Sequence, residues 1–421
     1  MIAAVLFISF AVLLLIGAPI AVCLGVSSVI SMIIQGAGRP LDTVMSSLPQ
    51  LFSSSTSKFV LLAIPFFILA GNIMDKAQIS KRLIRLAETC VGHLRGGLAI
   101  VCVIVSCFFA AISGSGPATV AALGLVMIPG MIRSGYSPSF SAALMGCAGA
   151  IGVIIPPSIT FVVYGSIADT SIGDLFKAGV IPGLIMGAAL IITALLIGRK
   201  LKLESLPKAS WHDRWVAFKE AFWGLLMPVI ILGGIYGGIT TPTEAGAIAV
   251  VYALFVEVFI TRSMTRKLFF EIIKSSVRIN AAIFLVVASA TALGQIMMYY
   301  NLSAAVLDTI MGISTSKVVI MALILVVLLI LGTFLEAAAI IMIVTPLLLP
   351  VINAIGVDPV HFGIIMLTSF AVGGQTPPVG MTLFVGASIA KISIERLSIA
   401  SIPYILTLVV MLVIIAFVPQ L

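Results

Sequence analysis

The chain has 421 residues, of which 61% are hydrophobic and only 9% are charged. Soluble proteins carry about 25% charged residues, so this composition excludes an ordinary soluble protein. Residues 318–335 and 397–421 contain no charge, and each is close to the roughly 20 residues that a helix needs to cross the hydrocarbon core of a membrane. The sequence therefore predicts an all-α, polytopic membrane protein.

Missing motifs exclude several chemistries. The sequence has no Gly-x-x-x-x-Gly-Lys-Ser/Thr loop to hold nucleotide phosphates. Its three histidines, His93, His212 and His361, are far apart, and no His-Glu-x-x-His or Cys-x-x-Cys pattern marks a metal site. The net charge of +8 comes from basic residues that cluster between hydrophobic segments, which is typical of membrane topology rather than of nucleic-acid binding.

The N-terminal segment is uncharged. No charged residue precedes Arg39, so the basic region of a secretory signal is missing, and we expect the N-terminus to belong to the mature membrane domain. As one helix, its about 34 apolar residues would measure about 50 Å, which is too long for a hydrocarbon core of about 30 Å. Gly17 and Pro19 in the middle predict two short helices instead.

Most of the 23 Lys and Arg residues fall in three windows, residues 76–95, 199–219 and 262–278. By the positive-inside tendency these segments are predicted to face the cytoplasm. No basic residue lies between Lys317 and Lys391, so the loops inside that stretch are predicted to lie on the opposite side or within the membrane.

Two basic segments are predicted to lie along the cytoplasmic surface. In residues 76–95, Ile79, Leu83 and Ala87 recur at helical spacing opposite a basic face. This pattern predicts an amphipathic helix at the membrane surface. Residues 211–219, which contain aromatic side chains, are expected to form a similar surface arm.

The sequence repeats itself at an offset of 221 residues. In one ungapped frame, every proline between positions 129 and 182 meets a proline of the second half, and three glycines meet glycines. Because prolines and glycines govern backbone geometry, this coincidence predicts two copies of one fold. The pairs are Pro129 with Pro350, Pro138 with Pro359, Pro156 with Pro377, Pro157 with Pro378, Pro182 with Pro403, Gly135 with Gly356, Gly152 with Gly373, and Gly165 with Gly386.

Counting membrane crossings between the basic loops predicts that the two copies enter the membrane from opposite sides. Inverted repeats are characteristic of secondary transporters, which bind their substrate at the interface between the repeats. The predicted domains are a first repeat, residues 1–198, with a hairpin at 98–132 and a broken helix at 138–169; a cytoplasmic connector, residues 199–221; and a second repeat, residues 222–421, with a hairpin at 318–352 and a broken helix at 359–390.

Each predicted hairpin turns in the middle of an apolar segment, at residues 113–117 in the first copy and 332–336 in the second. Such a re-entrant tip leaves backbone groups that need protein or water partners inside the membrane. The tips are therefore candidate binding sites. A purely structural alternative is helix capping, by Ser115 at the first tip and by a capping box of Thr333 and Glu336 at the second.

Each predicted broken helix contains a Pro-Pro pair, within residues 149–158 and 373–380. Two adjacent prolines remove two hydrogen-bond donors and interrupt the helix. The freed carbonyl groups, together with Ser158, Gln375 and Thr376, form an oxygen-rich set of the kind that coordinates sodium. The alternative is a kink without a ligand. Helix N-termini at the hairpin tips favour an anionic substrate.

Three acidic residues within apolar segments are candidates for a functional role. Glu336 at the second tip is the strongest, as an organiser of the tip or as a neighbour of an ion site. Thr241 and Glu244 have the spacing of a capping box, which favours a structural role for Glu244. Glu257 is expected near Arg262 and the membrane interface.

Six ordered motifs across the chain resemble those of one family, the large membrane subunit of tripartite ATP-independent periplasmic (TRAP) transporters. The resemblance implies sodium-coupled uptake of an organic acid anion, of the sialic acid or C4-dicarboxylate type, delivered by a periplasmic substrate-binding protein. It also implies a small four-helix membrane subunit, expected here as a separate chain, an elevator-type transport domain on a scaffold, and a bacterial inner-membrane location. The motifs lie at residues 64–71, 92–99, 113–122, 155–158, 236–245 and 376–380.

The same resemblance implies two sodium regions and a substrate site. Relatives of this pattern often have Ser-Gly-Ser-Ser and Asn-Phe-Met-Glu tips, whereas this chain has Ser-Gly-Ser-Gly and Thr-Phe-Leu-Glu. The implied sodium-binding residues are Ser113, Ser115, Gly149, Gly152, Pro156 and Ser158 in the first region and Gly332, Thr333, Glu336, Gly373, Gln375, Thr376 and Pro377 in the second; the implied substrate-binding residues are Ser115, Gly116, Thr119, Gln375 and Thr376.

Two other functions are weighed against this one. A stand-alone cation-coupled carboxylate symporter or exchanger could use the same repeats without partner subunits. An intramembrane hydrolase needs a positioned base, and the only histidine near an apolar segment, His361, is expected at its outer end, away from Ser113 and Ser115. We therefore expect a transporter and no enzymatic activity.

Overall fold

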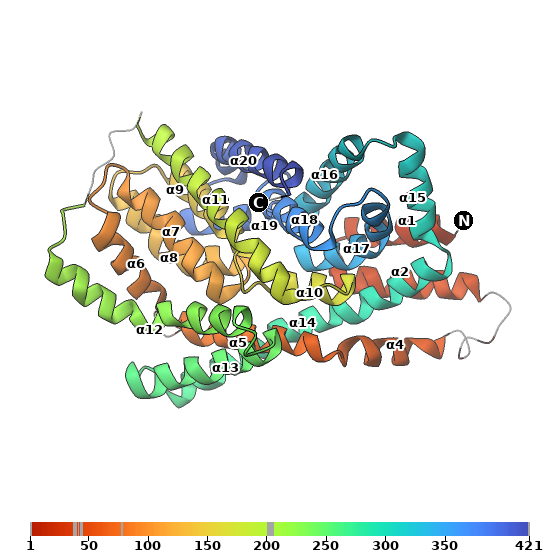
Figure 1. The fold of residues 1–421 in the computed structure, drawn as a ribbon, viewed down its shortest axis with the longest axis horizontal. Helices are drawn as coiled ribbons and strands as arrows, with labels where there is room; N and C mark the ends of the chain where they lie inside the picture. Colours follow the sequence, from red (N-terminus) through yellow and green to blue (C-terminus); the bar gives the residue numbers. More distant parts are fainter. Residues whose placement is uncertain are drawn as a thin grey trace.

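The computed structural model describes residues 2–36, 40, 42, 45–76, 79–199 and 206–419, and every regular element in these ranges is helical (Figure 1). Nine of the described helical segments are long and apolar enough to cross a membrane, which confirms the predicted all-α polytopic fold. The elements are α1 (Ile2–Leu15), α2 (Ile20–Gln35), α4 (Ser47–Thr56), η1 (Phe59–Leu62), α5 (Ala63–Lys76), α6 (Ile79–Val91), α7 (Gly97–Ser113), α8 (Gly116–Arg133), α9 (Pro138–Ala150), η2 (Ile151–Val153), α10 (Ile159–Ala168), α11 (Ile172–Gly198), α12 (Trp211–Tyr236), α13 (Pro242–Phe255), η3 (Val256–Ile260), α14 (Arg266–Tyr299), α15 (Leu302–Ile313), α16 (Lys317–Phe334), α17 (Ala337–Ala354), α18 (Pro359–Gly373), α19 (Met381–Ala390) and α20 (Ile394–Phe417).

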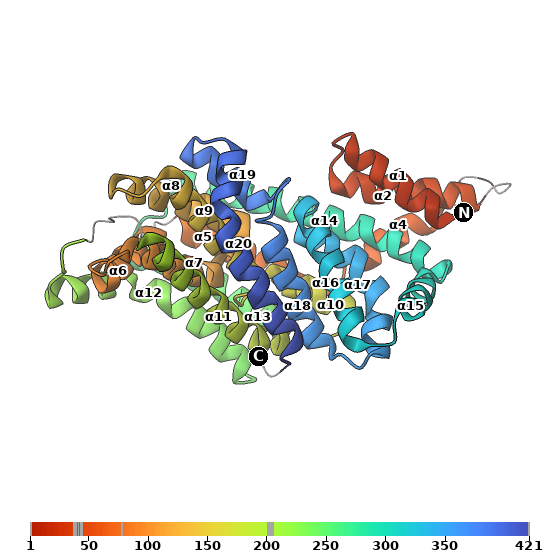
Figure 2. The ribbon, with the colours of Figure 1, turned by 90° about the horizontal axis from the view of Figure 1, so that it is seen from above.

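The N-terminal segment is divided where its sequence predicts. Helices α1 and α2 pack against each other and are separated at Gly17 and Pro19. Gly17 has a φ of +84°, a left-handed conformation that glycine adopts readily. Pro19 precedes the first residue of α2. The two helices lie at the end of the molecule opposite α6 and α12 (Figure 2).

Both predicted hairpins are pairs of helices joined by sharp turns. Helix α7 ends at Ser113 and α8 begins at Gly116, with Gly114 between them at a φ of +59°. Helix α16 runs through Phe334, so the second turn lies at Leu335 and Glu336, later than the predicted start at residue 332. Gly332 stays inside the helix, where it packs closely against Gly373.

Both predicted broken helices are interrupted at their Pro-Pro pairs. Helix α9 passes into the short 3₁₀ helix η2 and the chain becomes helical again at α10. Helix α18 ends at Gly373 and α19 begins at Met381. The helix boundaries follow the offset of the sequence repeat, since adding 221 to the bounds of α8 gives those of α17. The orientation of the two copies in a membrane stays a prediction.

The two copies are interleaved in space. Helix α10, the second half of the first broken helix, packs against α17 of the second hairpin. Helix α19, the second half of the other broken helix, packs against α8 and α9 (Figure 2). Each broken helix therefore begins in its own copy and ends against the hairpin of the other copy.

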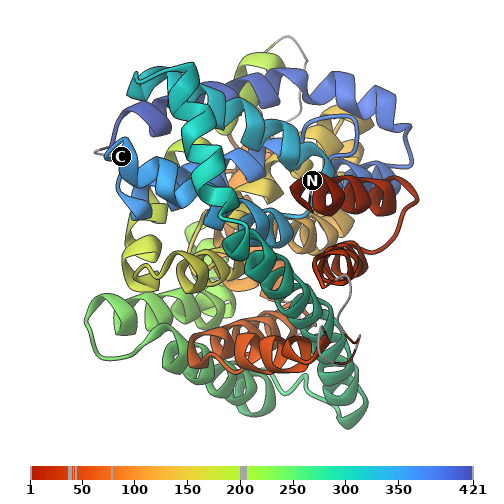
Figure 3. The same ribbon diagram turned by 90° about the vertical axis from the view of Figure 1, so that its right-hand side faces the viewer.

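Two long helices extend beyond the length that a membrane crossing requires. Helix α12 begins at Trp211, inside the predicted connector, because Ser210 and Asp213 form a capping box that starts the helix there. Helix α14 is continuous over 34 residues and runs beside the red-orange α4 and α5 (Figure 3). Residues 200–205 of the connector and residues 77–78 of the predicted surface helix lie outside the described residues.

Candidate functional site

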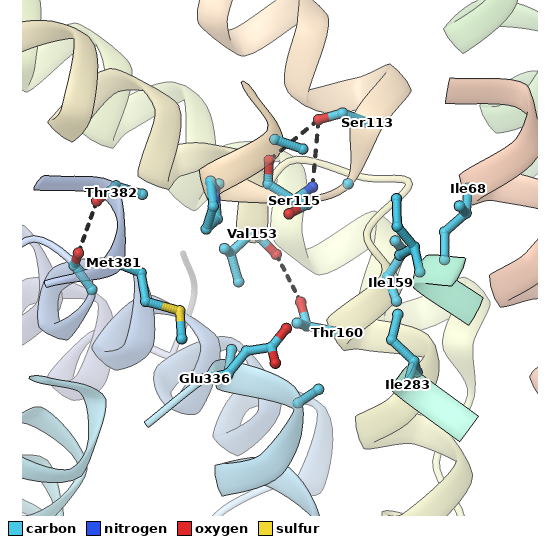
Figure 4. Close-up of a pocket in the computed structure, with 18 of the residues that line it drawn as sticks. Ile68, Ser113, Ser115, Val153, Ile159, Thr160, Ile283, Glu336, Met381 and Thr382 are labelled. Carbon is cyan, nitrogen blue, oxygen red and sulfur yellow. Dashed lines mark hydrogen bonds between the residues drawn. The ribbon is translucent and has the colours of Figure 1, made fainter. Parts of the chain in front are cut away.

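A cavity of about 530 Å³ lies where the tips of both hairpins meet α5 and α14 (Figure 4). The first tip, between α7 and α8, and the second tip, between α16 and α17, both contribute to its lining. Its charged lining residues are Asp75 of α5, Arg278 of α14 and Glu336 of the second tip. Segments from the two copies of the repeat therefore share one cavity.

The first tip is held by hydrogen bonds between its own side chains and backbone. The Ser113 and Thr119 hydroxyls lie 2.8 Å apart, and Thr119 Oγ1 donates to the Ser115 carbonyl at 2.9 Å. Ser115 occupies the N-cap position of α8, but its side chain makes no capping hydrogen bond. Capping by Ser115, the structural alternative, is therefore absent. Ser115 and Gly116 line the cavity, whereas Thr119 is fully buried behind it.

The first tip packs closely against the first break. A Cβ atom built on Gly152 would lie 3.2 Å from Thr119 Oγ1, and one built on Gly149 would lie 2.3 Å from a methyl group of Val120. On the tip side, a Cβ on Gly114 would lie 3.1 Å from the Pro157 carbonyl oxygen. The glycines are therefore required for this approach, which concentrates backbone and hydroxyl oxygens in one place.

Ser158 and Pro156 lie further along the same break. The Ser158 hydroxyl donates to the Val153 carbonyl at 2.6 Å and contacts the Thr160 hydroxyl at 2.7 Å. These bonds connect the two ends of the interruption, so the hydroxyl of Ser158 already has partners. Pro156 is buried within the break.

The second tip meets the second break through two glycines. A Cβ on Gly373 would lie 2.7 Å from both Cα and the carbonyl carbon of Gly332, so the two backbones are in direct contact. The Gly380 amide donates to the Thr333 carbonyl at 3.3 Å. The Thr333 hydroxyl donates to the Ile330 carbonyl at 2.8 Å instead of capping α17. The predicted alternative of a Thr333–Glu336 capping box is therefore wrong.

Glu336 is the acidic residue of the second tip. It occupies the N-cap position of α17, its side chain makes no capping hydrogen bond, and it points into the cavity (Figure 4). Within the described residues no hydrogen bond or ion pair holds its carboxylate. Glu336 is therefore free to interact with a group that enters the cavity.

Gln375 lies in the second break, on the side that faces the first copy. Its side chain is fully buried, and Nε2 donates to the Gly146 carbonyl of α9 at 2.6 Å and contacts Thr382 Oγ1. Thr382 Oγ1 donates to the Gly374 carbonyl at 2.8 Å. Gln375 Oε1 is buried and has no hydrogen-bond partner in the described part of the chain. An unpaired buried oxygen is unfavourable unless something binds it.

Thr382 was missed by the sequence analysis. Its signal is a hydroxyl in the first turn of α19, directly after the Pro-Pro interruption. Thr376 and Pro377 remain at the break, where the Thr376 hydroxyl donates to the Val372 carbonyl at 2.8 Å and Pro377 is exposed. Neither Gln375 nor Thr376 lines the cavity, so their implied substrate contact stays a prediction.

The other two acidic candidates lie away from the cavity. Glu244 forms the predicted capping box with Thr241 at the start of α13, which confirms its structural role. Glu257 is fully buried and accepts hydrogen bonds from the Thr261 and Ser263 hydroxyls. It makes no ion pair with Arg262 in the described structure, and its place near the membrane interface stays a prediction.

The chain matches the family model described as "Tripartite ATP-independent periplasmic transporter, DctM component" over residues 7–421. It is 44% identical to the isethionate TRAP transporter permease protein DctMQ of Oleidesulfovibrio alaskensis, over 99% of this chain and 65% of that protein. It is 40% identical to the C4-dicarboxylate TRAP transporter large permease protein DctM of Pseudomonas aeruginosa, over 90% of this chain and 88% of that protein. The sialic acid TRAP transporter large permease protein SiaM of Vibrio cholerae is 39% identical to it, over 86% of this chain and 85% of that protein.

A solved structure has a related fold. The YdaH transporter of Alcanivorax borkumensis, whose topology is described as unusual, superposes with a TM-score of 0.61 and covers 89% of this chain and 88% of its own, at 17% identity. This likeness concerns the fold alone. The family model and the relatives above align with most or all of the chain. The chain therefore belongs to the family of large membrane subunits of TRAP transporters, multi-pass transport proteins of the bacterial inner membrane rather than enzymes.

Proposed function

We propose that this chain imports an organic acid anion, coupled to sodium, and that the anion occupies the cavity between the hairpin tips. The observation that carries the proposal is that both tips, each packed on a broken helix, share one cavity of about 530 Å³. Broken helices at a repeat interface are the usual substrate and ion sites of secondary transporters. The relatives named for isethionate, C4-dicarboxylates and sialic acid all concern acidic solutes, which supports an anionic substrate.

The cavity offers two features that favour an anion. The N-terminal residues of α8 and α17 line it, and the first turn of a helix presents amide groups and a partial positive charge. Arg278 of α14 also lines it and adds a full positive charge. Glu336 and Asp75 oppose this charge, so we infer that a cation bound near the tips offsets them while the anion is present.

Two oxygen clusters are the proposed sodium sites. The first consists of the Ser113 and Thr119 hydroxyls with the Ser115 carbonyl, packed against Gly152. The second consists of Gln375 Oε1, the Gly374 carbonyl and Thr382 Oγ1. Hydroxyl, amide and carbonyl oxygens are the ligands that hard cations prefer. A sodium ion in the second cluster would supply the missing partner of Gln375 Oε1.

Sodium binding would couple to substrate binding through the tips. The first cluster lies in the first hairpin turn, and Thr382 of the second cluster is close to that turn, since a Cβ built on Gly116 would lie 3.6 Å from Thr382 Cγ2. An ion in either cluster would therefore help to fix the turn whose residues line the cavity. A substrate anion would then meet preformed helix N-termini. Movement of the hairpins and broken helices against the scaffold of α5, α12, α13 and α14 is the proposed elevator step.

The partners are proposed from the same family membership. A periplasmic substrate-binding protein would deliver the anion, and a small membrane subunit would complete the scaffold. The test is uptake of radiolabelled succinate, isethionate and sialic acid into vesicles that contain the chain with its small subunit, with and without the binding protein and a sodium gradient. We expect uptake of one of these acids only when both the binding protein and a sodium gradient are present. Uptake without the binding protein would favour a stand-alone symporter, and uptake without sodium would contradict sodium coupling.

A further inference from the structure

The first half of α12 carries an exposed row of aromatic side chains. Trp211, Trp215, Phe218 and Phe222 are separated by four, three and four residues, which places them on one face of the helix. Their exposed fractions are 83%, 58%, 37% and 39%. The rings of Trp215 and Phe218 stack at a centroid distance of 5.7 Å, and those of Phe218 and Phe222 contact at 5.9 Å. We refer to these four residues as the α12 stripe.

The face of α12 that carries its small residues packs against the protein. Ala217 and Ala221 are buried, and a Cβ built on Gly224 would lie 2.6 Å from a methyl group of Ile79 on α6. Glu220 forms an ion pair of 2.7 Å with Arg85 of α6. These contacts fix the rotation of α12 and leave the stripe exposed. Helix α12 lies at the edge of the molecule (Figures 1 and 2).

Two cations flank the stripe. The Arg214 guanidinium carbon lies 5.3 Å from the ring centroid of Trp211, and Lys219 Nζ lies 5.4 Å from that of Trp215. Arg214 Nε donates to the Thr89 carbonyl of α6 at 3.2 Å, which orients the guanidinium. Neither cation pairs with an acidic side chain within the described residues. Their remaining donors are therefore available to an external anion.

The length of α12 places the stripe at the membrane interface. Its 26 residues measure about 39 Å, roughly 9 Å more than the hydrocarbon core. Every charged residue of the helix precedes Ala221, so the first turns extend beyond the core while the rest crosses it. In the first turn the Ser210 hydroxyl accepts from the Asp213 amide, and the Asp213 carboxylate lies at the same end of the helix. The basic side chains Arg214 and Lys219 are therefore the groups proposed to bind an anion here.

We propose that the α12 stripe binds the headgroup of an anionic phospholipid, with Arg214 and Lys219 holding its phosphate and the rings contacting its glycerol and upper acyl chain. Trp and basic residues together favour the membrane interface, and anionic lipids attract such segments. A protein that covered the rings would have to place acidic side chains against both cations, because burying them without a counter-charge is unfavourable. A phospholipid supplies an anion and an apolar chain in one molecule.

Intrinsic fluorescence tests this site directly, because all three tryptophans of the chain, Trp211, Trp215 and Trp223, lie on α12. The chain is reconstituted with its small membrane subunit, whose tryptophans are replaced by phenylalanine, in equal amounts of phosphatidylglycerol and phosphatidylcholine. Brominated acyl chains, which quench tryptophan on contact, are placed on one lipid or the other. We expect brominated phosphatidylglycerol to quench at least twice as strongly as brominated phosphatidylcholine.

Substitutions separate binding from mere proximity. In the double variant Arg214→Gln/Lys219→Gln, the ratio of the two quenching strengths should fall to about one. Lys267→Gln, at an exposed basic position of α14, is the matched control and should keep the wild-type ratio. Equal quenching in the wild type, or a preference that survives the double substitution, would overturn the proposal. Weak quenching by both lipids would also overturn it, because the stripe would then be covered by protein.

Discussion

Gln375 shows how a single side chain connects the two copies of the repeat. Its amide nitrogen reaches the Gly146 carbonyl on α9, while its backbone lies in the break between α18 and α19. Its amide oxygen remains buried without a partner in the described structure. Thr382 contacts the same amide and donates to the Gly374 carbonyl. This arrangement groups amide, hydroxyl and carbonyl oxygens whose proposed ligand is sodium.

Thr382→Val should raise the sodium concentration that gives half-maximal uptake by about tenfold, which corresponds to the loss of about 1.4 kcal/mol of binding free energy. The reason is that valine has the shape of threonine but no hydroxyl ligand. Initial uptake rates over a series of sodium concentrations measure the change. Thr382→Ser keeps the hydroxyl and should stay within about twofold of the wild type. A sodium dependence unchanged in the valine variant would remove Thr382 from the site.

Gly373→Ala should destabilise the protein by about 1–3 kcal/mol, because its Cβ would lie 2.7 Å from the backbone of Gly332 and neither chain has room to move freely. Thermal unfolding in detergent measures the effect. Gly312→Ala is the matched control, since no atom lies within 4 Å of a Cβ built there and alanine favours the helix. Equal melting temperatures of the Gly373 variant and the wild type would contradict the close packing of tip on break.

At the scale of helices, the sequence predicted interruptions better than contacts. The Pro-Pro pairs, Gly17 with Pro19, and the Thr241–Glu244 box each act through local geometry, so their neighbours in sequence were enough to predict them. The second turn lies at the end of the predicted tip, because Gly332 does not break the helix but packs closely against Gly373 inside it. Tertiary packing decided this position, and a single sequence does not contain it.

Thr241→Ala should lower the free energy of unfolding by roughly 0.5–2 kcal/mol through the loss of the N-cap of α13, while sodium-dependent uptake per folded molecule stays unchanged. Thr241→Ser preserves the capping oxygen and should behave like the wild type. Melting temperature and uptake are measured on the same preparations. Loss of sodium coupling in the alanine variant would contradict this prediction. It would show that the cap takes part in transport, although it lies away from the cavity.

For the whole molecule, interleaving of the copies explains why the candidate site combines distant segments. Helix α10 packs against α17 and α19 packs against α8, so each hairpin contacts the broken helix of the other copy. The repeat predicted two tips and two breaks, but not that Gln375 would face α9 or that α5 and α14 would close the cavity. Those placements depend on how the copies pack, which a pattern of prolines and glycines leaves open.

Sodium and the anion are proposed to move together through this chain. The most direct measurement is simultaneous influx of ²²Na⁺ and labelled substrate into vesicles that contain the complex and its binding protein, at zero membrane potential. We predict sodium influx that depends on substrate, and the loss of both fluxes in the double variant Ser113→Ala/Thr382→Val. Substrate influx without accompanying sodium, or coupled fluxes that persist in the double variant, would contradict the account.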